Sequence, residues 1–287
     1  MFRKLMSLLA AFVLFAGLCS GAAAADAQAK TVFNGMKLGF WDLQNSAPPP
    51  DLGEGEHDFC TLGPVGTDKY GRQVGITAGH CADPTGAPPP EHAYEFAVYD
   101  VAAKDFGPIG YTRFIQPKAN QGYQDYMVIE FVPGVQLSAK GPHLEITGIL
   151  EIPQGPGAPN PDPQLNLLGA ALGNTNELVK SGARTGTHYG RITNNGGGLY
   201  QSWAYLDKGD SGGPAVWHVP GSAYPSEANG FQSTGPWAGI VTRLGLAVPP
   251  YVYTSSANIL ADLKARDAAS GSDGSVIGAG FAVAAQG

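Results

Sequence analysis

Short runs rich in β-branched and aromatic residues follow one another along the chain, and loops rich in glycine and proline separate them. Most runs have the length of a strand, about four to eight residues. The 41 glycines and 23 prolines favour many short strands joined by turns. The runs are 31–33, 73–77, 94–101, 126–132, 143–150, 189–193, 215–219, 239–243 and 251–254. The pattern predicts an all-β protein, either a barrel or a sandwich.

Helical periodicity is clear only near the C-terminus. Residues 256–266 place Ile259, Leu260 and Leu263 on one face, and Ser255 or Ser256 can cap this helix. The residues after it, 267–287, are small and rich in glycine, so we expect a flexible tail there.

The N-terminus has the layout of a secretory signal peptide. A basic start is followed by the apolar stretch 5–18 and by small residues up to Ala25, after which we expect cleavage. A membrane anchor is one alternative, but a bilayer requires roughly 20 apolar residues. A lipid on Cys19 is another, although Leu18 is larger than the residue expected before a lipidated cysteine. The sequence predicts a secreted protein with no stable membrane insertion once the signal is removed.

The chain is acidic, with a formal net charge of −7 at neutral pH. It contains no basic run, so nothing in it suggests nucleic acid as a partner.

Two cysteines, Cys60 and Cys81, remain after the signal peptide. An even pair in an exported protein indicates a disulfide, with two free thiols as the alternative.

The string from Gly209 to Pro214, Gly-Asp-Ser-Gly-Gly-Pro, suggests a nucleophile. Its glycines leave Ser211 accessible and let the backbone turn so that amide N–H groups converge. The N–H groups of Gly209 and Ser211 could then stabilise the oxyanion that forms when a hydroxyl attacks a carbonyl. The alternative is an ordinary glycine-rich turn.

A serine nucleophile needs a base, normally a histidine. His80 ends a β-rich run and adjoins Cys81, whose disulfide would hold it in place. The other histidines have less distinctive surroundings. They are His57, His92, His143, His188 and His218. No two histidines have a ligand-like spacing, and a set of two cysteines and one histidine lacks a fourth zinc ligand, so we expect no metal and no cofactor.

The strings 77–81, Thr-Ala-Gly-His-Cys, and 209–214 resemble the chymotrypsin-like serine peptidases. The resemblance implies a catalytic triad of His80, Asp125 and Ser211, because in this family the aspartate opens a hydrophobic strand, as in 124–131. Asp100 and Asp105 are the rival aspartates: Asp100 follows its apolar run, and Asp105 precedes Phe-Gly-Pro.

The resemblance also implies two antiparallel six-stranded β-barrels with the active site between them, and a disulfide between Cys60 and Cys81 behind His80. We expect a peptidase domain at 26–266. Barrel one would occupy about 31–150 and barrel two about 167–255, with the helix at 256–266.

Segment 179–190 resembles that of the bacterial extracellular, streptogrisin-like branch, with both cysteines of that segment replaced, by Val179 and Tyr189. That branch uses an internal basic residue to pair the aspartate before the serine. Lys180 occupies this place, so we predict a Lys180–Asp210 ion pair that orders the oxyanion loop.

The substrate pocket departs from the family pattern. Counting back from the serine puts Tyr205 at the pocket base, or Asp207 if the register shifts. After the serine, Thr242 fits the substrate-binding strand, whereas Arg243 and Leu244 are bulky and would narrow the pocket.

Together these features predict a monomeric secreted serine endopeptidase that acts on polypeptides through an acyl-enzyme intermediate. The alternatives are a catalytically impaired extracellular binding module and an esterase.

Overall fold

The computed structural model describes residues 29–43, 48–55, 59–82, 96–116, 124–150, 177–196, 198–218, 221–243 and 250–285. The predicted signal peptide at 1–25 lies outside these ranges. Within them, no helix is both long enough and apolar enough to cross a membrane.

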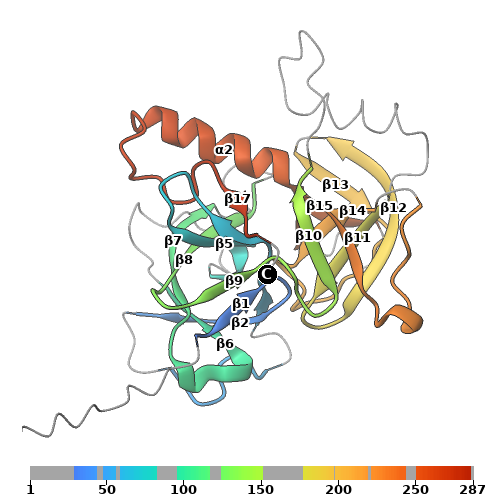
Figure 1. Cartoon of the computed structure of the whole chain (residues 1–287), viewed down its shortest axis with the longest axis horizontal. Coiled ribbons are helices and arrows are strands. Elements are labelled where there is room, and N and C mark those ends of the chain that lie inside the picture. The colour runs from blue at the N-terminus through green and yellow to red at the C-terminus, as the bar shows by residue number, and fades with distance from the viewer. Residues whose placement is uncertain are drawn as a thin grey trace, which may run out of the picture.

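The C-terminal half forms a closed barrel of six antiparallel strands (Figure 1). In the order in which they pair, the strands are β11 (Glu177–Gly182), β12 (Gly186–Gly196), β13 (Leu199–Ser202), β16 (Tyr251–Ser255), β15 (Ser233–Arg243) and β14 (Pro214–Trp217). The pairing of β14 with β11 closes the circle.

The N-terminal half forms an eight-stranded sheet that curls as a half-barrel. In sheet order its strands are β17 (Ala282–Val283), β4 (Val65–Thr67), β5 (Gln73–Thr77), β8 (Tyr126–Phe131), β7 (Gly110–Gln116), β6 (Phe96–Asp100), β2 (Lys37–Asp42) and β3 (Cys60–Thr61). A separate parallel pair joins β1 (Thr31–Phe33) to β9 (Gln136–Ser138). The described residues also form the short 3-10 helices η1 (Gly79–Cys81) and η2 (Val101–Phe106) in this half and η3 (Glu227–Asn229) in the C-terminal half.

The predicted all-β fold, with two packed β units and one C-terminal helix, is confirmed. The N-terminal unit differs from a closed barrel, since no described pairing joins its two edge strands, β3 and β17. Strand β10 (Leu144–Ile149), which the sequence placed in barrel one, instead runs parallel to β15 of barrel two. Leu144 and Ile146 of this strand are buried beside Trp237, which explains the arrangement.

One apolar cluster joins the two units. Val74 and Tyr126 of the first unit pack in the same cluster as Trp237 and Ile240 of the second, and all four are fully buried. Removal of this apolar surface from water holds the units together. This packing therefore fixes the strand ends and loops of one unit relative to those of the other.

Helix α2 (Ser256–Ala269) is capped as predicted, since the Ser255 hydroxyl accepts the Asn258 N–H at 3.0 Å. The helix continues three residues beyond its predicted end at Arg266.

The expectation of a flexible tail after residue 266 is wrong. Strand β17 pairs with β4, and Phe281 is buried with its ring edge against Trp237, 5.6 Å between centroids. Arg72 also donates hydrogen bonds to the carbonyls of Gly274 and Val276. A single buried aromatic residue and backbone hydrogen bonds thus dock a segment whose composition suggested disorder, beneath α2 (Figure 1).

Candidate active site

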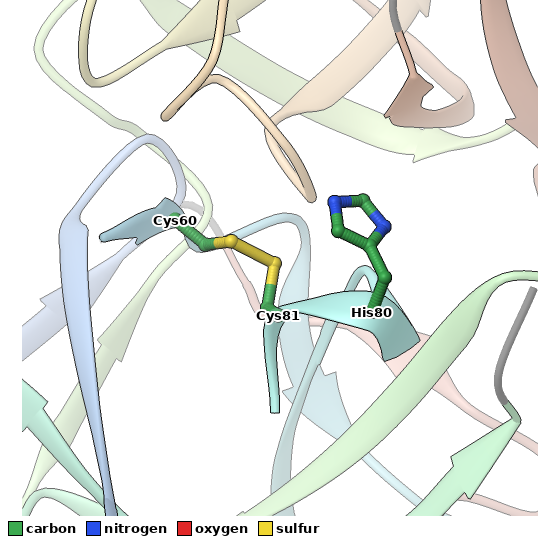
Figure 2. Close-up of side chains that lie close together, drawn as sticks. All are labelled: Cys60, His80 and Cys81. Atoms are coloured by element: carbon green, nitrogen blue, oxygen red, sulfur yellow. A yellow bond between two sulfur atoms is a disulfide. The ribbon is translucent and has the colours of Figure 1, made fainter. Parts of the chain in front are cut away.

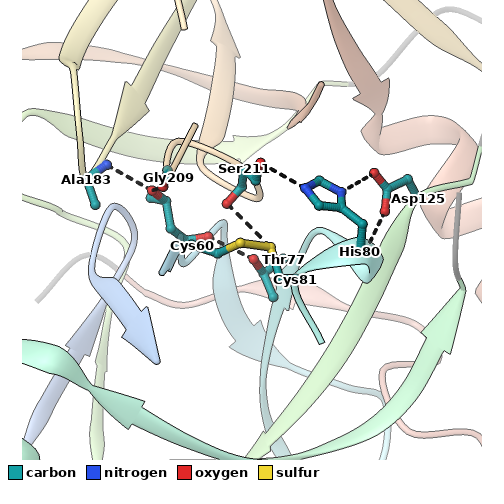
Figure 3. Close-up of a disulfide and its surroundings, with 9 residues drawn as sticks. Cys60, Thr77, His80, Cys81, Asp125, Ala183, Gly209 and Ser211 are labelled. Atoms are coloured by element: carbon teal, nitrogen blue, oxygen red, sulfur yellow. Dashed lines mark hydrogen bonds and ion pairs between the residues drawn. A yellow bond between two sulfur atoms is a disulfide. The ribbon is translucent and has the colours of Figure 1, made fainter. Parts of the chain in front are cut away.

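His80 and Asp125 meet because strands β5 and β8 are neighbours. Thr77 pairs with Met127, which brings η1 after β5 next to the residue that precedes β8. The Asp125 carboxylate accepts the His80 backbone N–H at 2.8 Å and contacts the ring Nδ1 at 2.6 Å (Figure 3). Each of the two carboxylate oxygens therefore contacts His80, and Asp125 itself is buried, with 1% of its surface exposed.

Ser211 lies on the loop before β14 and reaches His80 from the other unit. The distance from His80 Nε2 to Ser211 Oγ is 2.9 Å. The His80 side chain is 30% exposed, so the histidine and serine face solvent while the aspartate is buried. In this arrangement a histidine can take the hydroxyl proton as serine attacks a carbonyl.

The two rival aspartates lie elsewhere. Asp100 pairs with Lys30 and accepts the Ala102 N–H at 2.9 Å, and Asp105 is exposed on η2. In the described part of the chain, neither forms a hydrogen bond to His80.

Two amide N–H groups of the Gly209–Gly213 turn have no acceptor among the residues that the structure describes. The N–H groups of Asp210 and Gly212 donate to the carbonyls of Asp207 and Val241, at 3.0 and 2.8 Å. Among the residues described, no protein acceptor takes the N–H of Gly209 or of Ser211. Gly209 has a φ of +95°, and a Cβ there would lie 2.6 Å from the Phe59 ring, so the turn requires glycine.

The predicted ion pair between Lys180 and Asp210 is present. Lys180 Nζ lies 2.7 Å from Asp210 Oδ2, and both side chains are fully buried. Asp210 also accepts the N–H groups of Arg184 and Thr185 at 3.0 Å and of Asp207 at 3.1 Å, and it bonds the Thr185 hydroxyl. The carboxylate beside Ser211 is therefore held from several directions.

Burial and charge act together on this pair. Burial lowers the pKa of Lys180, and the nearby Asp210 charge offsets only part of that effect. Burial alone would raise the pKa of Asp210, but the Lys180 ammonium and hydrogen bonds from Thr185 hold it below its ordinary value.

The Cys60–Cys81 disulfide is also present and lies beside His80 (Figure 2). The two sulfurs and the His80 ring lie within 4.8 Å of one another, a spacing that could suit a metal. The disulfide commits both sulfurs, however, so neither is a thiolate that could bind zinc.

The residues predicted to line the substrate pocket have varied surroundings. Tyr205 is 42% exposed and meets the rings of His188 and Tyr251 edge-on, at centroid distances of 5.1 and 5.6 Å. The Asp207 carboxylate faces Arg184 at 3.6 Å, so it is already paired with a cation.

Further along the predicted pocket, Thr242 is buried and its hydroxyl bonds that of Thr254 at 2.5 Å. The backbone of Arg243 pairs with Val252, while its side chain and all of Leu244 lie outside the described residues. That these residues line a pocket stays a prediction.

Sequence reasoning missed two threonines that contact this site. Thr185 binds Asp210, and Thr61 binds the carbonyl of Gly209 at 2.7 Å. The sequence did contain a signal for Thr61, because Thr61 follows Cys60. The predicted disulfide joins Cys60 to Cys81, the residue after His80, and so brings the neighbours of Cys60 close to the nucleophile.

No protein-family model matches the sequence, and no curated protein does. Solved structures with a similar fold include Thermobifida fusca protease A (15% identity, TM-score 0.47, covering 81% of this chain and 95% of that one). Nocardiopsis protease has 13% identity and a TM-score of 0.46 over 81% of this chain and 96% of its own. Cellulomonas bogoriensis chymotrypsin has 17% identity and a TM-score of 0.43 over 82% of this chain and 96% of its own.

Each of these three TM-scores is below 0.5, so the likeness concerns the fold alone. These three proteins are bacterial chymotrypsin-like serine proteases.

Proposed function

We propose that this protein is a secreted serine endopeptidase with His80, Asp125 and Ser211 as its catalytic triad. The observation that carries the proposal is the continuous hydrogen-bonded path from the buried Asp125 through His80 to Ser211, at 2.6 and 2.9 Å. On the same turn as the serine lie two amide donors for which the described residues offer no protein acceptor. A hydroxyl, a base, an orienting carboxylate and oxyanion donors are the parts that acyl transfer requires.

In this mechanism His80 removes the Ser211 proton as the hydroxyl oxygen attacks the scissile carbonyl carbon. The N–H groups of Gly209 and Ser211 bind the oxyanion, and His80 then donates its proton to the leaving amine. Water repeats the sequence, so that the acid is released and Ser211 regains its proton. Asp125 holds the imidazole orientation and stabilises its cationic form.

Polypeptides are the proposed substrates and the extracellular space is the proposed location. The disulfide supports export, because such bonds persist in oxidising compartments. The predicted signal sequence at 1–25 supports it as well. The Lys180–Asp210 pair would support the oxyanion loop, because Asp210 lies between the two donor residues.

The test is hydrolysis of a diverse fluorogenic peptide library by purified residues 26–287, beside Ser211→Ala. A serine-reactive phosphonate measures nucleophile competence independently, and matched ester substrates detect an esterase. We expect peptide cleavage and phosphonate labelling by the parent protein and neither by Ser211→Ala.

If the folded parent protein is labelled by the phosphonate but cleaves no peptide, the result would favour a binding module with an obstructed pocket. Absence of both labelling and cleavage would overturn the proposed triad.

A further inference from the structure

Thr61 touches the nucleophile turn in a way that the triad does not explain. It belongs to β3 of the N-terminal unit, is fully buried, and lies far in sequence from Ser211. Its backbone N–H donates to the Ser211 carbonyl at 2.8 Å, and its hydroxyl donates to the Gly209 carbonyl at 2.7 Å. One residue therefore bonds the carbonyls of both residues that offer oxyanion donors.

The direction of the Thr61 hydroxyl proton follows from its partners. The Ala183 N–H donates to the hydroxyl oxygen at 2.9 Å, so that oxygen acts as an acceptor there (Figure 3 shows Ala183 and Gly209). The hydroxyl hydrogen is then left to point at the Gly209 carbonyl, which has no hydrogen to donate. The Thr61 carbonyl is itself held, because it accepts the Thr77 hydroxyl at 2.8 Å.

Through the Gly209 and Ser211 carbonyls, these bonds restrain the peptide groups next to those that carry the two oxyanion donors. The Gly209–Asp210 peptide is held at both ends, by Thr61 on its carbonyl and by the Asp207 carbonyl on its N–H, at 3.0 Å. Gly209 has wide conformational freedom because it has no side chain, and it adopts a φ of +95°. The Thr61 hydroxyl is thus a side-chain restraint on a glycine of the turn that has no side chain of its own to hold it.

The turn and Thr61 also fit closely. A Cβ added at Gly212 would lie 2.6 Å from the Thr61 carbonyl oxygen, and one at Gly213 would lie 3.2 Å from the Thr61 methyl group. The nucleophile turn therefore rests directly on this residue, which belongs to the other β unit.

We propose that Thr61 is a positioning residue for the oxyanion donors: its hydroxyl holds the Gly209 carbonyl so that the Gly209 and Ser211 N–H groups stay aimed at the developing oxyanion. This inference rests on the proposed function. Preorganised donors stabilise the transition state more than the bound substrate, so a loosened turn lowers kcat and leaves KM nearly unchanged.

The test compares four variants of residues 26–287. Thr61→Val removes the hydroxyl at nearly constant volume and keeps the backbone bond to Ser211. Thr61→Ser and Thr61→Ala lose the same methyl group and differ only in the hydroxyl. Thr112→Val is the matched control, because Thr112 is a buried threonine of the same unit whose hydroxyl accepts the Phe96 N–H at 2.9 Å.

We expect kcat of Thr61→Val to fall about 10- to 100-fold, below the roughly 10²- to 10³-fold loss from deleting a donor outright. KM should stay within about twofold, and the inhibition constant of a peptide aldehyde should rise by the same factor as kcat falls, since its adduct carries the oxyanion. Thr61→Ser should keep most of kcat and Thr61→Ala should lose it. Thr112→Val should lose stability alone.

The inference is overturned if Thr61→Val keeps its kcat, or if Thr61→Ser and Thr61→Ala lose kcat equally. The serine and alanine pair decides the question even if the valine variant does not fold. Failure of the proposed function gives a different result, because the parent protein would then neither cleave peptides nor label at Ser211, and both proposals would fall.

Discussion

The buried ion pair offers the sharpest test of how this chain stabilises its nucleophile turn. Replacing Lys180 with methionine keeps most of the side-chain volume and removes the ammonium. Asp210 would then be a fully buried carboxylate without its cation. The expected result is a marked loss of stability, because a buried charge left without its partner is costly.

The magnitude follows from what remains around the carboxylate. Breaking a buried pair from one side typically costs about 3–5 kcal/mol. Here the N–H groups of Arg184, Thr185 and Asp207 and the Thr185 hydroxyl would still bind Asp210. The loss should therefore lie near the lower end, about 3 kcal/mol. With a denaturant slope of about 4 kcal/mol/M in guanidinium chloride, the midpoint should fall by about 0.75 M.

The assay is equilibrium unfolding followed by tryptophan fluorescence and circular dichroism. Lys104→Met is the matched control, because its partner Glu54 has a side chain that is 59% exposed and would stay solvated. Exposed pairs contribute little, so its midpoint should stay close to that of the parent protein. The double variant Lys180→Met/Asp210→Asn should recover part of the loss, since it removes the orphaned charge.

A Lys180→Met protein within about 1 kcal/mol of the parent would refute this reasoning, because the cost of an unpaired buried charge is larger than that. So would a double variant no more stable than the single one.

Two further predictions concern the C-terminal segment and acid stability. Phe281→Ala should lower the free energy of unfolding by about 3–5 kcal/mol, because Phe281 is 4% exposed. Phe106→Ala is the control and should lower it little, because Phe106 is 46% exposed. Equal losses in the two variants would contradict the docking of the C-terminal segment. The folded pKa of Asp210 lies below its unfolded value, so between these two pKa values the unfolded state binds more protons than the folded state. The stabilisation that the Asp210 charge contributes is therefore present above about pH 4 and is lost as the pH falls through the folded pKa. Asp210→Asn should show a shallower loss of stability in acid, and an unchanged slope would count against that assignment.

The sequence was most informative where chemistry demands particular residue types in a short string. Two strings indicate a serine nucleophile and its base: the glycine-rich string around Ser211 and the string that ends in His80 and Cys81. Asp125 could be chosen as their partner because it opens an apolar strand. The structure brings all three side chains of the predicted triad into hydrogen-bonding contact. The Lys180–Asp210 contact was predicted from the resemblance of segment 179–190 to the streptogrisin-like branch, and the structure contains it.

Composition was a poor guide to residues 267–285. Small residues and glycines resemble a mobile terminus, because they bring little apolar surface. The contacts that order them include one buried phenylalanine, one added strand and the Arg72 bonds to their carbonyls. Their partners lie near the start of the domain or in barrel two.

By itself, the sequence determined which residues can carry the chemistry, their order along the chain and the all-β character of the fold, because these depend on residue type and local pattern. Only the tertiary structure decided that β10 joins barrel two, that the N-terminal sheet stays open, and that Thr61 reaches Gly209 across 148 positions. The physical reason is that such contacts depend on which surfaces pack together, and a hydrogen bond between distant residues leaves no periodicity in the sequence around either partner.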